Sequence, residues 1–383
     1  MNFNVHPVVA LLVIVLAISA IGVWMWGSGE ARRLGGPAEL LVDPNGHLYV
    51  QMQNQLLEHD ADGEFVRRHD LAALAVETVL GGTAFFSNGD ILIRRGADPR
   101  SLTDNIRAFF RHTNRTSTDA SLPDTGLYRC NLRSASCQLF GAAAIDFKAT
   151  YGVFIDPATD EVYFSDTTRH VLHKYSSDGW ELAGPVGGFK FPNQLMMYDG
   201  QLFVADTNRQ RIRIVDPATS VFANEIESIN VVPPRARQAG QTWPSHLARV
   251  DDQWWVNNMR SAMNEGGIYI FDNAWIYQRR VNLPTGSDPI AVLPFNNEVL
   301  VSDWNNDRVH RVAISGDYLG DLESAGLDSL VEESNAARLR FQLYGYLGVA
   351  AFLVVIGLLL LKALTTVPER EHRSRRDNGD GSA

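Results

Sequence analysis

The segment Asn193–Thr219 reads NQLMMYDGQLFVADTNRQRIRIVDPAT and contains three short apolar runs separated by polar turns. Asp199 and Gly200 separate the first two runs, and the third run, RIRIV, follows Asp206 and a polar turn. Short runs rich in β-branched and aromatic residues, bounded by Gly, Asn and Asp, indicate antiparallel strands joined by tight turns. This segment therefore predicts three strands of one small sheet.

The same pattern recurs along the middle of the chain. The clearest second copy is YGVFIDPATDEVYFSDTTRHVLHKYSSDG (Tyr151–Gly179), whose Asp166 lies about 40 residues before Asp206, a spacing typical of repeat proteins. In the copy that starts at Ser245, we assign Asn257 to the position of this Asp. The remaining copies start at Ala38, Thr83 and Pro289.

A repeat of about 40–50 residues with three or four strands, and no helical stretch between them, is typical of a β-propeller blade. Blades arranged around an axis cover one another, so that each small sheet buries both faces. The six copies fill residues 37–325. We therefore predict an all-β, six-bladed β-propeller that forms one domain.

Two uncharged apolar segments flank this domain, at residues 8–26 and 341–361. About 19 helical residues span about 28 Å, which is sufficient to cross the hydrocarbon core of a bilayer. The first segment lacks a basic N-terminal flank and a small-residue cleavage site after its apolar run, which favours a retained anchor over a cleaved signal peptide. We predict two transmembrane helices. The remaining predicted parts are a short N-terminal tail (1–7), two linkers (27–36 and 326–340) and a basic disordered tail (362–383).

The orientation follows from the basic residues beside the two spans. The tail after the second span carries Lys362, Arg370, Arg373, Arg375 and Arg376, against four arginines on the inner flanks. The positive-inside bias places such a tail in the cytoplasm. Because two spans put both termini on one side, we predict a plasma-membrane or inner-membrane protein whose propeller is periplasmic or extracellular.

Cys130 and Cys137, the only two cysteines, lie in GLYRCNLRSASCQLF on either side of a predicted hairpin turn. Symmetric placement around a turn can bring two sulfur atoms within bridging range, and a disulfide suits an oxidising compartment. The alternative is a pair of unrelated buried thiols.

Composition excludes several classes of function. The chain has 383 residues, a formal net charge of −10 and 20% charged residues, whereas nucleic-acid binding requires a basic face. There is no P-loop, kinase or nucleophile-elbow motif. The histidines lack the spacing of a zinc site, and we expect them at the surface or in turns. Those considered are His47, His59, His69, His170 and His173.

An Asp closes the second strand of three copies, and an Arg follows three to five residues later. Short Asp side chains cap turn amides, and an Arg from the next strand can pair with the carboxylate. We predict that these residues hold the blades together, a role that does not require contact with a ligand. They are Asp166 with Arg169, Asp206 with Arg209, and Asp303 with Arg308.

The residues FPNQLMMYDGQLFVADTNRQRIRIVDP (Phe191–Pro217) resemble an NHL repeat, and YFSDTTRHVLHKY and VLVSDWNNDRVHRV resemble it more loosely. The order of the third to fifth blades also resembles the strictosidine-synthase-like and gluconolactonase-type six-bladed propellers. The roles of these families range from lactone or ester hydrolysis to pure protein or ligand binding, so the resemblance implies a fold and leaves the function open.

In the hydrolase-like relatives, the axial end of each innermost strand supplies oxygen ligands to a calcium-type ion. The resemblance implies Glu39, Asn193 and Asp288 as metal ligands and His246 as a possible catalytic base. Ser245 and His246 depart from the Asp-Asn pair of those relatives, and Thr83 and Tyr151 are poor ligands in the second and third blades. Calcium usually takes six to eight oxygens, and the alternative is a solvated polar lining.

Two functional hypotheses follow. The first is a membrane-anchored binding or scaffolding propeller that recruits a protein, peptide or glycan on one face. The alternative is a calcium-dependent lactonase or esterase, in which the ion polarises the substrate carbonyl. The insertion Asp98–Thr125 carries aromatic residues that either contact a partner or the membrane, or pack onto the propeller. We expect the Pro- and Arg-rich segment Asn230–Thr242 to be exposed.

Overall fold

The structure is a computed structural model that describes residues 7–74, 76, 81–95, 126–141 and 151–365. The insertion Asp98–Thr125, residues 1–6 and the tail beyond residue 365 lie outside the described residues. The chain divides into two compact units, residues 33–336 and residues 1–32 with 337–383, and each unit is described by itself below.

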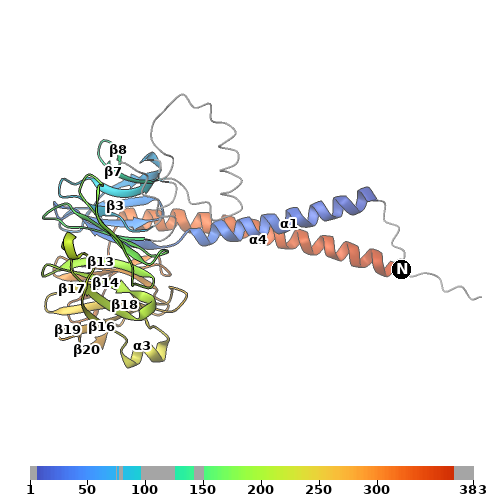
Figure 1. Ribbon diagram of the computed structural model, residues 1–383. Helices are drawn as coiled ribbons and strands as arrows, with labels where there is room; N and C mark the ends of the chain where they lie inside the picture. The colour runs from blue at the N-terminus through green and yellow to red at the C-terminus, as the bar shows by residue number, and fades with distance from the viewer. Residues whose placement is uncertain (1–6, 75, 77–80, 96–125, 142–150, 366–383) are drawn as a thin grey trace, which may run out of the picture. The chain divides into compact units, whose positions relative to one another are not determined.

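The larger unit is the predicted six-bladed β-propeller (Figure 1), and this prediction is confirmed. Its strands form six four-stranded antiparallel sheets, each built from strands consecutive in the chain. The first three blades contain β1 (Pro37–Val42), β2 (Leu48–Met52), β3 (Gln55–His59) and β4 (Phe65–Asp70); β5 (Ala84–Phe85), β6 (Ile91–Arg95), β7 (Gly126–Asn131) and β8 (Ser136–Leu139); and β9 (Tyr151–Ile155), β10 (Val162–Asp166), β11 (Val171–Tyr175) and β12 (Glu181–Val186).

The last three blades follow the same order. They contain β13 (Pro192–Tyr198), β14 (Gln201–Asp206), β15 (Arg211–Val215) and β16 (Glu225–Asn230); β17 (Trp243–Val250), β18 (Gln253–Met259), β19 (Gly267–Asp272) and β20 (Tyr277–Arg280); and β21 (Pro289–Phe295), β22 (Glu298–Asp303), β23 (Arg308–Ala313) and β24 (Tyr318–Asp321). The first strand of each sheet contacts the first strand of the next, and β21 returns to β1, which closes the ring.

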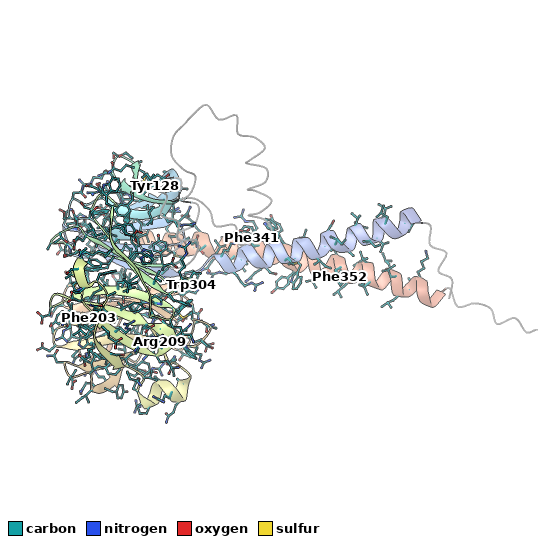
Figure 2. All side chains as sticks on the ribbon, in the orientation of Figure 1. Tyr128, Phe203, Arg209, Trp304, Phe341 and Phe352 are labelled. Carbon is teal, nitrogen blue, oxygen red and sulfur yellow. A yellow bond between two sulfur atoms is a disulfide. The ribbon has the colours of Figure 1, made fainter. Side chains whose placement is uncertain are left out.

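Antiparallel pairing assigns the loops to two faces. The first strand of every sheet starts, and the fourth strand ends, at the same end of the sheet, so both chain ends leave the propeller by one face. We call this the chain-end face, and it also carries the turns between second and third strands. Arg209 and Trp304, both in such turns, lie on the same side of the propeller in Figure 2. The opposite end, which we call the far face, carries the turns after the first and third strands.

The residue before the repeated Asp joins neighbouring blades. Ser165 Oγ accepts a hydrogen bond from the Gly152 N–H (2.9 Å) and donates one to the Asn193 carbonyl of the next blade. A Cβ on Gly152 would lie only 2.0 Å from that carbonyl oxygen, so glycine permits this close approach. In the fifth blade, Asn257 Nδ2 similarly donates to the Pro289 carbonyl of the sixth (2.5 Å).

The strand register corrects one assignment in the repeat. Asp206 lies opposite Pro192, and Asn258 lies opposite Pro244 at the equivalent position. Asn258, rather than Asn257, therefore replaces the Asp. Asn257 takes the joining position that Ser165 has in the third blade.

Among the described strands, the first and sixth blades each consist of four consecutive strands, and neither blade contributes a strand to the other. A helix covers the junction between them. Ser302 Oγ donates to the Ala38 carbonyl (3.4 Å). Helix α4 (Ala325–Thr365) buries Leu327, Leu330 and Val331 among residues of both blades. We refer to this junction as the seam.

The expected linker 326–340 is therefore helical. Its residues Leu327, Leu330 and Val331 have the i, i+3, i+4 spacing of an apolar helix face. The Leu327 N–H donates to Ser324 Oγ (3.2 Å), which caps the start of the helix. The first turns of α4 thus belong to the propeller.

The segment Asn230–Thr242, expected to be exposed, is partly buried. It forms the short helix α3 (Pro234–Ala239), with Arg235 and Arg237 exposed. Val231, Val232 and Ala236 are buried in the core of the fourth and fifth blades. The apolar residues that interrupt the Pro- and Arg-rich sequence account for the burial, because they pack between the two sheets.

The smaller unit pairs α1 (Pro7–Arg33) with the rest of α4. Both helices are long and apolar enough to cross a membrane by length and composition, over Leu11–Arg33 and within Ala325–Lys362. Gly348 lies against the α1 backbone, since a Cβ there would be 2.6 Å from the Trp24 nitrogen. The rings of Trp26 and Tyr344 stack with centroids 5.7 Å apart. Small residues at such a contact are typical of packed membrane helices.

Candidate functional site

Glu39 lies near the axis, on the innermost strand β1 of the first blade. Its carboxylate accepts hydrogen bonds from the Thr83 N–H (3.1 Å) and the Thr83 hydroxyl (2.7 Å). Burial raises the pKa of Glu39 to about 7, although both hydrogen bonds from Thr83 oppose the rise. Near neutral pH this side chain therefore exists as a mixture of acid and carboxylate.

The first strands of the six sheets form the inner ring of the propeller, and we call equivalent register positions on them one level. His246, on the first strand of the fifth blade, lies at the same level as Glu39. Glu39 pairs with Gln51 and His246 pairs with Asn257, both one residue before the repeated Asp position. His246 Nδ1 lies 3.2 Å from Ser245 Oγ, and burial lowers the pKa of His246 to about 4. It is neutral at pH 7 and is a weak base.

The other two predicted metal ligands have different partners. Asn193 Nδ2 donates to Thr207 Oγ1 (2.7 Å) in the fourth blade. Asp288 Oδ1 accepts from the Gly266 N–H (3.1 Å), and burial raises its pKa despite this bond.

The predicted ligands also lie at different levels of the inner ring. Pro37, Pro192 and Pro289 occupy equivalent register positions, opposite Met52, Asp206 and Asp303. Glu39 is two residues after its proline, Asn193 is one residue after, and Asp288 is one residue before. By the register, Glu39 is one step from Pro37 because a bulge lies between them, Asn193 lies within the bulge after Pro192, and Asp288 precedes Pro289. The three therefore do not share one level. Within the part of the chain that the structure describes, no group of three or more His, Cys, Asp or Glu side chains is arranged to hold a metal ion.

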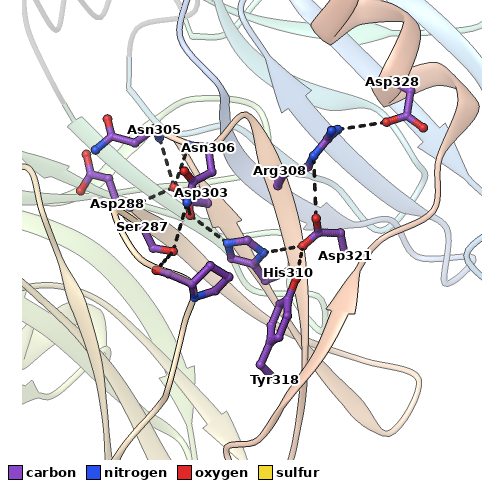
Figure 3. Close-up of polar contacts among 11 residues, drawn as sticks. Ser287, Asp288, Asp303, Asn305, Asn306, Arg308, His310, Tyr318, Asp321 and Asp328 are labelled. Atoms are coloured by element: carbon purple, nitrogen blue, oxygen red, sulfur yellow. Dashed lines mark hydrogen bonds and ion pairs between the residues drawn. The ribbon is translucent and has the colours of Figure 1, made fainter.

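A buried network in the sixth blade joins the repeated Asp303 to His310 (Figure 3). Asp303 accepts the Asp288 N–H (2.9 Å) and lies 2.8 Å from His310 Nε2, while His310 Nδ1 lies 2.7 Å from Asp321 Oδ1. Burial lowers the pKa of His310, but the two carboxylates more than compensate and the net shift is upward. Burial raises the pKa of Asp303, but the hydrogen bonds from His310 and the Asp288 amide outweigh it and hold that pKa well below its usual range.

Sequence reasoning missed His310 as the partner of Asp303, because His310 lies two residues beyond the predicted Arg308 on the same strand, β23. The predicted partner, Arg308, instead contacts Asp328 of α4 (3.0 Å) and Asp321 (3.7 Å). The network thus connects the sixth blade to the helix at the seam.

The other two Asp–Arg pairs differ from each other. Arg169 contacts Asp166 at 3.1 Å and receives a turn cap from it, since the Arg169 N–H donates to Asp166 Oδ1 (2.8 Å). Arg209 donates to the Gly188 carbonyl (2.6 Å), and Asp206 is bound by Arg211 (2.9 Å) instead. The expected Asp206–Arg209 pair is therefore replaced, because Arg211 lies directly opposite Asp206 in the strand register.

Three of the histidines expected at the surface or in turns lie on strands with little exposure. They are His59 on β3, and His69 on β4 and His173 on β11, whose side chains are 11% exposed. His59 is fully buried rather than at the surface, and its Nε2 lies 2.8 Å from Ser324 Oγ at the start of α4. His47 Nδ1 and His69 Nε2 contact Glu58, at 3.1 and 2.7 Å. Each of these contacts ties strands or turns together.

Cys130 and Cys137 are joined by a disulfide across the paired strands β7 and β8. Cys130 is fully buried in the core of the second blade. The bond crosslinks the outer hairpin that follows the insertion.

No protein-family model matches the chain, and no curated protein matches it. Similar solved structures include virginiamycin B lyase from Staphylococcus aureus, at 14% identity and a TM-score of 0.46, over 74% of this chain and 83% of that one. A chain of the nidogen–laminin complex is 13% identical with a TM-score of 0.47, over 77% of this chain and 94% of that one. The tricorn protease is 16% identical with a TM-score of 0.46, over 75% of this chain and 26% of that one. These likenesses concern the fold alone.

Proposed function

We propose that the protein is a membrane-anchored, NHL-type propeller that binds or scaffolds a protein, peptide or glycan outside the cytoplasm. The observation that carries this proposal is that both ends of the propeller chain continue into helices apolar enough to cross a membrane. In α4 the helix that covers the seam and the apolar segment are one continuous element, Ala325–Thr365. A propeller tethered by the chain-end face keeps its far face available for a partner.

Binding is favoured over catalysis by the state of the axial residues. Glu39, Asn193 and Asp288 are each held by a neighbour in the protein, and His246 is a weak base. General-base catalysis works best when the pKa of the base lies near the working pH. His246 does not satisfy this condition, and Glu39, whose pKa of about 7 does, has its carboxylate bound by the Thr83 N–H and hydroxyl.

The far face of the fourth and fifth blades carries the aromatic residues expected of a binding surface. Trp254 and Trp275 stack with centroids 4.7 Å apart, and Tyr198 packs edge-on against Trp254. Tyr198 is 39% exposed and the neighbouring Ile276 is 61% exposed. Exposed aromatic residues supported by a rigid cluster are enriched at interfaces, so we assign the partner to this surface.

The binding test uses the full chain purified from native membranes after crosslinking. We expect Tyr198→Ala/Ile276→Asp to lose a partner that the wild type retains. The matched control is Trp180→Ala, which removes a 62% exposed aromatic residue from the third blade. Equal loss in the control, or no loss in the double variant, contradicts the assigned surface.

The orientation test uses a reporter fused after Ala383. We expect it to report the cytoplasm, because the positive-inside bias places the tail there. A periplasmic or extracellular signal reverses the proposed orientation while leaving the anchoring itself intact.

A further inference from the structure

Three adjoining loops of the chain-end face carry basic residues and no acidic ones. They are residues 187–191, 207–210 and 231–242, with sequences GGFKF, TNRQ and VVPPRARQAGQT. We call their four exposed cations the basic arc. Its members are Lys190, Arg209, Arg235 and Arg237.

Hydrogen bonds make these loops one continuous surface. Arg209 Nη1 donates to the Gly188 carbonyl (2.6 Å), and the Asn208 N–H donates to the Lys190 carbonyl (3.0 Å). Gln210 Nε2 then reaches Thr242 Oγ1 (3.3 Å) in the loop that contains α3. The arc therefore runs from the connection before the fourth blade to the connection after it.

Among the residues that the structure describes, the carboxylates next to the arc form ion pairs with arginines outside it. Asp206 is fully buried beneath it and is bound by Arg211 and by the Lys190 N–H (2.6 Å). Glu265, in the next turn, pairs with Arg260. The arc thus concentrates four positive charges in a chain whose formal net charge is −10.

The far face of the same blades has the opposite sign. The turn after β13 carries Asp199, the turn after β15 carries Asp216, and the turn after β17 carries Asp251 and Asp252. The positive charge is therefore localised at the face where the chain enters and leaves the propeller.

We propose that the basic arc contacts anionic phospholipid headgroups of the membrane that holds α1 and α4. The inference rests on the proposed membrane anchoring and applies to either leaflet. Only residues 34–36 separate α1 from β1, and three extended residues reach about 10 Å, so the first strand of the propeller begins within about 10 Å of the end of α1. Arginine binds phosphate oxygens in a bidentate manner, and each basic residue near an anionic surface contributes about 1 kcal/mol.

The experiment places the full chain in nanodiscs of phosphatidylcholine alone or with about 30% phosphatidylglycerol, a fraction that gives an anionic surface potential. A fluorophore is attached at Gln238→Cys, an exposed position of α3, since both native cysteines are in the disulfide. Nitroxide-labelled headgroups quench the fluorophore when α3 lies at the lipid surface. We expect about twofold stronger quenching in the anionic discs, and its loss at about 0.5 M salt, where screening is strong.

Arg235→Gln/Arg237→Gln should remove at least about half of the extra quenching, because the attraction scales with the number of basic residues. The control Arg133→Gln/Asn297→Asp changes the net charge by the same amount in far-face turns and should leave quenching unchanged. Lys190→Gln/Arg209→Gln tests the other half of the arc without altering α3, and unfolding temperatures show whether each variant folds.

The outcomes separate the two proposals. A protein that enters nanodiscs but is quenched equally in neutral and anionic discs overturns the lipid contact and leaves the anchoring intact, and the arc then suits an acidic protein surface. A protein that does not enter the discs overturns the anchoring. Equal loss of quenching in the far-face control also overturns the assignment to the arc.

Discussion

The fourth and sixth blades place the same aspartate at the same register position but pair it with different cations. Asp206 lies opposite Pro192 and is bound by Arg211 at 2.9 Å, whereas Asp303 lies opposite Pro289 and is bound by His310 at 2.8 Å. Arginine keeps its charge at any physiological pH, whereas histidine titrates near neutrality. The ion pair at this repeated position is therefore independent of pH in the fourth blade and sensitive to pH in the sixth.

The difference matters because the sixth blade forms the seam. The joint between the fourth and fifth blades is an ordinary contact within the ring, whereas the sixth blade meets the first and is covered by α4. The titratable His310 also contacts Asp321. Arg308 forms ion pairs with both Asp321 and Asp328 of α4. Protonation of His310 is therefore linked to the contacts that close the ring.

The largest expected effect comes from removing the helix contact at the seam. Leu330→Ala should lower the free energy of unfolding by about 2–5 kcal/mol, because it leaves a cavity among buried residues of both blades. Urea unfolding of the full chain, followed by tryptophan fluorescence, measures the change. The matched control is Leu319→Ala on β24, a leucine that is 49% exposed, and its effect should be small. Equal effects would mean that α4 does not stabilise the seam.

Neutralising the two aspartates tests the comparison directly. Asp206→Asn leaves the charged Arg211 without its buried partner. It should lower the free energy of unfolding by about 2–4 kcal/mol, close to the cost of breaking a buried ion pair. Asp303→Asn should cost about half of that above pH 7, because His310 can lose its proton and become neutral. Unfolding free energies of both variants at pH 8 decide the matter, and a larger cost for Asp303→Asn would contradict the proposed difference.

The two blades also show what the sequence could predict. The recurring strand pattern, with Asp166 and Asp206 about 40 residues apart and Asp303 at the matching position of another copy, was sufficient to recognise the repeat and the propeller. Their partners depended on the strand register and side-chain packing. Arg308 lies opposite Asp303 as Arg211 lies opposite Asp206, but its guanidinium contacts α4, and His310 takes its place.

The candidate axial site was less predictable for a related reason. β-Bulges at the start of β1, β13 and β17 shift the register, so the resemblance could not show that Glu39 and His246 share a level that Asn193 and Asp288 do not. The helical turns at residues 325–336 were overlooked because the stronger apolar segment that follows dominates the hydropathy pattern.

A smaller effect is expected from the titration of His310. Its folded pKa is raised, so its stabilising effect is fully present below the unfolded pKa of about 6.5 and is lost as the pH rises through the folded value. Unfolding free energy should fall more steeply between pH 6 and 9 in the wild type than in His310→Gln. We expect a difference below about 2 kcal/mol, since one pKa unit corresponds to about 1.4 kcal/mol.

Glu39 must be controlled in this measurement, because its raised pKa has the same sign. Its folded pKa of about 7 lies above the unfolded value of about 4.3, so stability falls as the pH rises between the two. The comparison is therefore made in a Glu39→Gln background, where the remaining slope reports His310. Asp206→Asn in the same background should leave that slope unchanged, since it removes no contact of His310. A slope that survives His310→Gln would contradict the assignment.

The smallest expected effect is that of calcium, and it tests whether the axial residues distinguish this propeller from a metal-dependent hydrolase. Glu39, Asn193 and Asp288 lie at three levels and have separate partners, so we expect millimolar calcium to raise the unfolding temperature of the full chain by less than about 1 °C. A lactonase or esterase site would instead give a clear rise in the wild type that Asn193→Ala abolishes. Asn258→Ala, at a buried amide away from the axis that donates to the Val231 carbonyl (2.9 Å), is the matched control, because it should leave any true calcium shift intact. A shift lost only in Asn193→Ala would replace the binding proposal with the hydrolase.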